Sequence, residues 1–111
     1  MNVSIGNQSW VVEKVPAHDP TLMVDGTECF GTTWIGHLRI CVSAELKEDA
    51  ARRTLRHELC HAFIWSTQAV RPESWAEEAL CDFMAMYGPQ ITRAADKLFE
   101  ALYVVDLDMT R

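Results

Sequence analysis

The chain has 111 residues, 49% of them hydrophobic, and a formal net charge of −6 at pH 7. This length predicts one domain, residues 1–111, with a single core, and so high a hydrophobic content excludes a disordered chain. The negative charge argues against nucleic acid and anionic membranes as partners, because both repel an acidic surface.

The expected location is the cytoplasm. No apolar run approaches the ~20 residues of a transmembrane helix, and Met1 to Gly6 lack the basic and apolar regions of a secretory signal. The cysteines contain no CxxC pair, which argues against a cysteine zinc ribbon. Small buried thiols are therefore favoured over disulfides at all four positions: Cys29, Cys41, Cys60 and Cys81.

The first forty residues carry the patterns of β-strands. Trp10–Val15 is rich in β-forming residues, and residues 1–8 before it are either a first strand or a frayed end. Pro16–Gly26, with its two prolines, is expected to be a loop. Glu28–Trp34 and His37–Val42 are expected to be strands joined by a tight turn. The second of these alternates, which places one apolar face on the core: Leu38, Ile40 and Val42.

The rest of the chain predicts helices. One runs from about Leu46 to Trp65, with acidic residues in or near its first turn, where they favour the helix dipole. A second starts at a capping box, Ser74 to Glu77, and ends at Gly88-Pro89. A third covers Gln90–Tyr103. The fold class is therefore α+β, a small, mostly antiparallel sheet packed on the first helix and two further helices.

The first helix contains the sequence HELCH, His57 to His61, which fits the pattern HExxH. Residues four apart on a helix share a face, so both histidines can point at one metal ion. Glu58 lies about 100° further round, beside the ion, where its carboxylate can take a proton from a metal-bound water. The pattern is typical of zinc hydrolases. The alternative is a buried helix whose histidines are satisfied by hydrogen bonds alone.

A zinc site needs a third protein ligand, and a ligating histidine usually donates its other N–H to a carboxylate. Glu78 and Asp82 share a face of the second helix and suit these two roles, while the capping box claims Glu77. Two alternatives stay open: both acids are solvated, or Cys81 is the zinc ligand.

With HELCH on one helix and Glu78 to Asp82 on the next, the chain resembles the gluzincins, HExxH followed by ExxxD. It is most similar to small phage and bacterial metallopeptidases of the ImmA/IrrE and SprT-like kind. The resemblance implies a minimal zincin-like domain in which His57, His61 and Glu78 bind Zn²⁺ and Asp82 orients a ligating histidine. It also implies that Glu58 is the general base.

The function expected from these features is zinc-dependent hydrolysis of peptide bonds in a peptide or protein substrate. The strand His37–Val42 could bind an extended peptide if it lies at a sheet edge. Tyr87 and His37 are candidates for stabilising the oxyanion. The alternative is a zinc-containing protein-binding module of phage or bacterial origin with little or no turnover.

Overall fold

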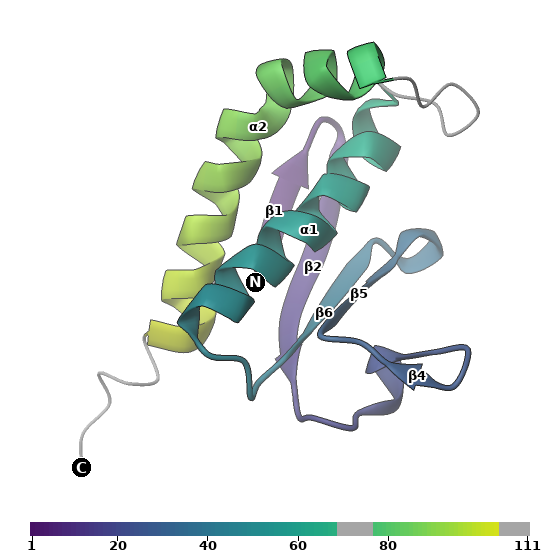
Figure 1. Cartoon of the computed structure of the whole chain (residues 1–111), viewed down its shortest axis with the longest axis vertical. Coiled ribbons are helices and arrows are strands. Elements are labelled where there is room, and N and C mark those ends of the chain that lie inside the picture. The colour runs from purple at the N-terminus through teal and green to yellow at the C-terminus, as the bar shows by residue number, and fades with distance from the viewer. Residues whose placement is uncertain (69–76, 105–111) are drawn as a thin grey trace.

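The computed structural model describes residues 1–68 and 77–104, without the side chains of residues 77–79, 81, 82 and 85. In this part of the chain it confirms the α+β class, with a four-stranded sheet, a two-stranded sheet and two long helices (Figure 1). The larger sheet and the helices are formed by β1 (Asn2–Ile5), β2 (Gln8–Val15), β5 (Gly31–Trp34), β6 (Arg39–Ser43), α1 (Glu48–Thr67) and α2 (Glu77–Phe99).

The larger sheet is mixed, with strand order β1-β2-β6-β5. The β1–β2 and β5–β6 pairs are antiparallel, as expected, but the central β2–β6 pair is parallel. The expected strand His37–Val42 corresponds to β6, which lies between β2 and β5 and has no free edge. The condition for peptide binding at this strand, a free sheet edge, is therefore not met, and β5 is the edge strand on this side of the sheet.

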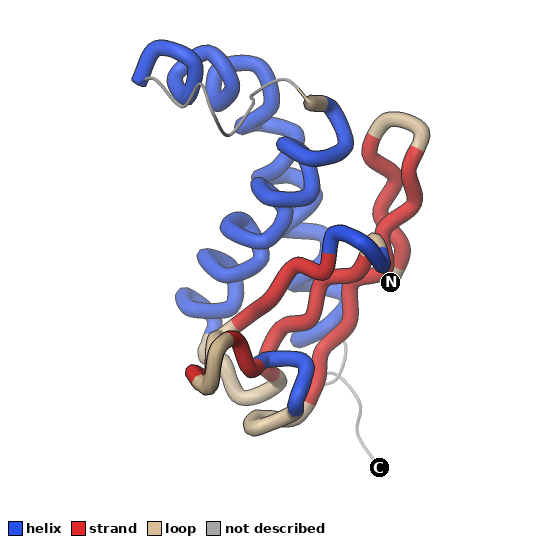
Figure 2. The backbone as a smooth tube through the Cα atoms, turned by 90° about the vertical axis from the view of Figure 1, so that its right-hand side faces the viewer, coloured by secondary structure: helices blue, strands red, loops and turns tan. Residues whose placement is uncertain are grey.

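Both helices cover the same face of the sheet (Figure 2). Side chains from β2, β6, α1 and α2 meet there in one apolar cluster, because alternate strand residues point to this face. The fully buried members include Trp10, Val12, Ile40, Val42, Leu55 and Leu59. The core thus fixes α1, which carries the HELCH residues, across the sheet.

The segment Pro16–Gly26, which the sequence predicts to be a loop, covers part of the opposite face of the sheet. Pro16–Gly26 is not wholly irregular, since it holds the 3-10 helix η1 (Pro20–Leu22) and the strand β3 (Met23–Val24). The strand pairs with β4 (Thr27–Glu28) to form a short hairpin. Leu22 is fully buried against Cys41, so β6 is buried on both faces rather than on one.

The first helix begins two residues later than expected, at Glu48, and its first turn carries the two acidic residues Glu48 and Asp49. Its far end is tied to β2 by a chain of hydrogen bonds. The Trp10 indole Nε1–H donates to the Ser66 hydroxyl at 2.8 Å, and that hydroxyl donates to Gln8 Oε1 at 2.6 Å. The C-terminal end of α1 is therefore held against the sheet.

The second helix is continuous where two helices were expected, because α2 runs through Pro89. Proline removes one helical hydrogen bond and bends a helix, and α2 is visibly bent (Figure 1). Its buried stripe, Phe83, Ile91, Ala95 and Leu98, continues across the proline. Packing of this stripe outweighs the local penalty, so the prediction that Gly88-Pro89 ends the helix is wrong.

Past α2, the π-helical turn η4 (Glu100–Val104) is held to the sheet. The Tyr103 hydroxyl donates to the Ser43 carbonyl at 2.6 Å, and Lys14 Nζ donates to the Leu102 carbonyl at 2.6 Å. Ser74, the first residue of the expected capping box, lies outside the described residues. None of the described helices is long and apolar enough to cross a membrane.

At Gly31 the backbone of β5 lies close to side chains of α1. A Cβ placed there would lie 2.7 Å from Thr54 Cγ2 and 3.0 Å from Glu58 Cγ. We predict that Gly31→Ala lowers the free energy of unfolding by about 1–3 kcal/mol through overpacking, as measured by urea denaturation. Gly36→Ala is the control, since a Cβ there meets nothing within 4 Å. Equal stability of both variants would contradict this close contact.

Candidate active site

The two histidines of HELCH lie together on the exposed side of α1. The ring centroids of His57 and His61 are 5.0 Å apart, and the rings meet edge to face. The His57 side chain is 66% exposed, and His61 is also exposed. Neither ring forms a hydrogen bond within the described part of the chain. The reading of these histidines as buried and satisfied by hydrogen bonds is therefore wrong for this structure.

Glu58 differs from its neighbours because it is buried, with 6% of its surface exposed. A buried carboxylate needs hydrogen-bond partners, since desolvation of a charge is costly. The Thr33 hydroxyl supplies one, donating to Glu58 Oε1 at 2.7 Å, with the Glu58 carbonyl a longer 3.3 Å away. The other carboxylate oxygen, Oε2, lies 3.9 Å from His57 Nε2. One oxygen is thus held by β5, and the other faces the imidazole.

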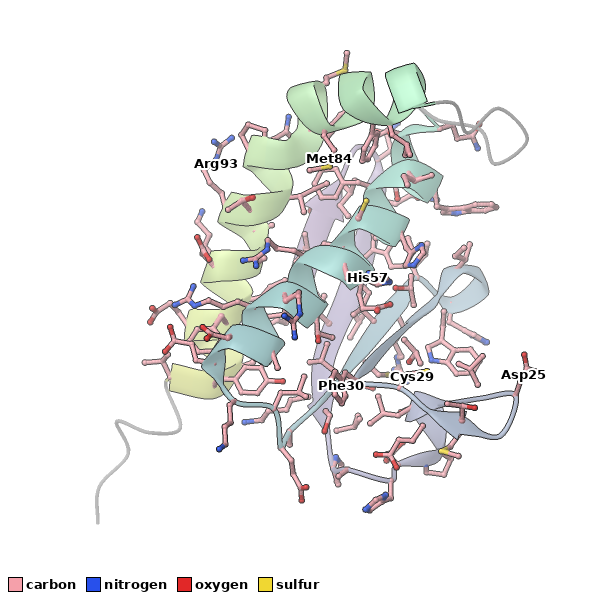
Figure 3. All side chains as sticks on the ribbon, in the orientation of Figure 1. Asp25, Cys29, Phe30, His57, Met84 and Arg93 are labelled. Atoms are coloured by element: carbon pink, nitrogen blue, oxygen red, sulfur yellow. The ribbon has the colours of Figure 1, made fainter. Side chains whose placement is uncertain are left out.

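A cavity of about 580 Å³ opens in front of these three residues. One wall is α1, with His57, Glu58 and His61, and another is β5. The β3–β4 hairpin closes the far side with Met23, Val24 and Asp25. Figure 3 shows His57 on α1 above β5 and Asp25 at the tip of the hairpin. The site is therefore a hollow that lies beside the edge strand of the sheet.

The donor atoms of the site decide whether a metal ion fits it. His57 and His61 supply nitrogens of the kind zinc prefers, on one helix face and without competing hydrogen bonds from the residues that the structure describes. Among the described residues, however, no group of three or more His, Cys, Asp or Glu side chains is placed to hold a metal ion. The two histidines thus fit a zinc site that needs a further ligand.

The remaining predicted participants belong to α2. The backbone of Glu78 and Asp82 is helical, but the side chains of Glu78, Cys81 and Asp82 lie outside the described residues. The sequence predicts Glu78 as the third ligand, Cys81 as an alternative ligand and Asp82 as the partner of a ligating histidine. These three roles stay predictions.

The sequence patterns missed Thr33 and the hairpin. Thr33 lies 25 residues before Glu58, and an isolated threonine in a β-rich stretch carries no signal of such a contact. The two candidates for oxyanion stabilisation lie elsewhere: His37 lines a different cavity, with Thr21 and Arg39, and the Tyr87 ring packs against Phe83 at 5.1 Å.

None of the cysteines that the structure describes lines the cavity in front of His57, Glu58 and His61. Cys29, Cys41 and Cys60 are free thiols. Burial raises the pKa of the Cys60 thiol, which lies between the two histidines in sequence. A thiol with a raised pKa stays protonated at neutral pH, so Cys60 is not poised as a nucleophile.

Comparison of the chain with models of known protein families, with curated proteins and with solved structures finds no match. The function proposed below therefore depends on the residues and geometry of the site itself.

We predict that Thr33→Val destabilises the protein by about 1–3 kcal/mol, because it leaves buried Glu58 Oε1 without this donor. Valine keeps the shape of threonine and suits a strand, so the loss reports the hydroxyl. Thr33→Ser, which keeps the hydroxyl, is the matched control. Chemical denaturation of both variants measures the difference, and equal losses for valine and serine would contradict the assigned hydrogen bond.

Proposed function

We propose that this chain is a zinc-dependent metallopeptidase that hydrolyses peptide bonds. The observation that carries the proposal is the arrangement on α1 of two exposed imidazoles, 5.0 Å apart, beside the buried carboxylate of Glu58. All three side chains line the same cavity. The resemblance of HELCH and of Glu78 to Asp82 to the ImmA/IrrE and SprT-like gluzincins supports the same conclusion.

In the proposed site His57, His61 and Glu78 would hold the metal ion, and Asp82 would accept a hydrogen bond from one of the histidines. Bound zinc supplies two effects, a lowered pKa of water and polarisation of the scissile carbonyl. Three protein ligands are the usual number for a catalytic zinc site, because one position stays available for chemistry.

Glu58 is the proposed general base. Its Oε1 is held by Thr33, so Oε2, on the side of His57, is the oxygen available to take a proton from the attacking water. The same oxygen then returns the proton to the nitrogen of the leaving amine. The burial of Glu58 keeps the carboxylate in one position throughout, since its packing beside Gly31 leaves little room for movement.

The substrate is proposed to lie along β5. In the described sheet this strand pairs only with β6, so its other edge is open to an extended peptide. The cavity follows β5 from Gly31 to Trp34 and brings such a peptide past Glu58. The three free cysteines of the described part suit the reducing cytoplasm, which is the proposed location.

We predict that Glu58→Gln keeps its bound zinc and loses activity by about 10²–10⁴-fold, because glutamine cannot accept the proton. Peptide cleavage and metal content are measured on the same preparation. His37→Ala is the control, since this exposed histidine lies outside the cavity. Wild-type turnover by the zinc-loaded Glu58→Gln variant would remove Glu58 from the mechanism.

Metal analysis of the purified protein is expected to find one zinc ion per chain. We predict that His57→Ala and His61→Ala each lose the ion, and that Glu78→Gln binds it at least tenfold more weakly. A chelator should abolish cleavage, and added zinc should restore it. A wild-type protein without bound metal contradicts the proposal. A zinc-loaded protein that cleaves no peptide favours the binding-module alternative.

A further inference from the structure

The cavity described above has a neighbour on the other side of Glu58. A second hollow of about 350 Å³ is lined by Cys29, Phe30, Arg53 and Thr54. Both hollows include Gly31, His57 and Glu58 in their walls, so they meet at these residues. Together they form one groove, called here the β5 groove, that passes the proposed catalytic residue on both sides.

The two ends of the β5 groove differ in chemistry. At the hairpin end the wall is largely apolar, and four of its side chains are at least 37% exposed: Met23, Val24, Trp34 and Ile35. Asp25 adds a negative charge at that end. The other end also has an exposed apolar side chain, Phe30, and differs in its charge, since its charged side chain besides the shared Glu58 is Arg53.

Arg53 is available for a ligand. It lies one turn before His57 on α1, on nearly the same face. Within the described part of the chain it forms no ion pair or hydrogen bond. Its neighbour Arg52 bonds to Glu48 at 3.2 Å and to Asp96 at 2.7 Å. Arg52 is therefore engaged in holding α1 to α2, whereas Arg53 faces the groove.

We propose that the β5 groove selects peptides with an acidic side chain on one side of the scissile bond and a large apolar side chain on the other. Arg53 is the specificity-determining residue, since a guanidinium binds a carboxylate with two parallel hydrogen bonds. Binding of an apolar substrate side chain at the hairpin end is favourable, because it removes the exposed apolar residues there from water. This inference rests on the peptidase function proposed above.

The order of the two side chains is fixed by charge. Asp25 repels an acidic residue at the hairpin end, and Arg53 attracts one at the other end. A minimum spacing follows from β5. Gly31, which both hollows share, and Trp34 at the hairpin end are three residues apart, about 10 Å at ~3.3 Å per residue in a strand. In an extended peptide the two selected side chains are therefore at least about three residues apart.

The test uses zinc-loaded protein and three fluorogenic peptides that share one large apolar residue. In each peptide the apolar residue lies on one side of the scissile bond, and Glu, Gln or Lys lies on the other. A second set of three peptides exchanges the apolar residue and the variable residue. The wild type is expected to cleave the Glu peptide of one set at least tenfold faster than its Lys peptide, measured as kcat/KM. Arg53→Glu is expected to reverse that preference.

Arg93→Glu is the matched control. It makes the same change in net charge, but Arg93 is on α2 and outside the β5 groove (Figure 3). The control is expected to keep the wild-type preference. An unchanged Glu-to-Lys ratio in Arg53→Glu, or an equal shift in Arg93→Glu, would overturn the assignment of Arg53.

Binding of the same peptides to zinc-loaded Glu58→Gln, followed by fluorescence anisotropy, separates this inference from the peptidase proposal. Cleavage without any charge preference leaves the peptidase in place and rejects the selective groove. Tighter binding of the Glu peptide that Arg53→Glu abolishes, without cleavage by the wild type, supports the groove and rejects the peptidase. If the peptides show no charge preference in either binding or cleavage, the selective groove is rejected.

Discussion

The burial of Glu58 between α1 and β5 is the constraint on which the rest of the site depends. A carboxylate with 6% of its surface exposed is stable there because the Thr33 hydroxyl bonds to it at 2.7 Å. Gly31 makes the contact possible, since a side chain at that position would collide with Thr54 and Glu58. The close approach of one glycine therefore positions the proposed base, and the exposed His57 and His61 line the same cavity.

One face of α1 packs on the sheet, and another lines the cavity. Leu55, Leu59 and Ala62 are fully buried and hold the helix on the sheet. His57 and His61 face the cavity, and Glu58 lies between the two sets. A polar residue at such a boundary can be fixed by the core and still reach a substrate. We infer that the rigidity of α1, secured at its far end through Trp10 and Ser66, is what positions the proposed catalytic groups.

Much of this could be predicted from the sequence because it depends on local periodicity. The four-residue spacing of His57 and His61 placed both on one helical face, and the acidic first turn located the start of α1 to within two residues. Contacts that depend on tertiary packing could not be predicted this way. The pairing of Thr33 with Glu58, the edge position of β5 and the passage of α2 through Pro89 each depend on how distant segments pack.

X-ray absorption at the zinc edge of the metal-loaded protein tests the central claim most directly, because it reports the atoms bound to the metal. The account predicts a low coordination number with two imidazole nitrogens and oxygen ligands at about 2.0–2.2 Å. A sulfur shell at about 2.3 Å would indicate cysteine ligation, and a shell without imidazole would exclude His57 and His61. Either result would contradict the proposed His57, His61 and Glu78 centre.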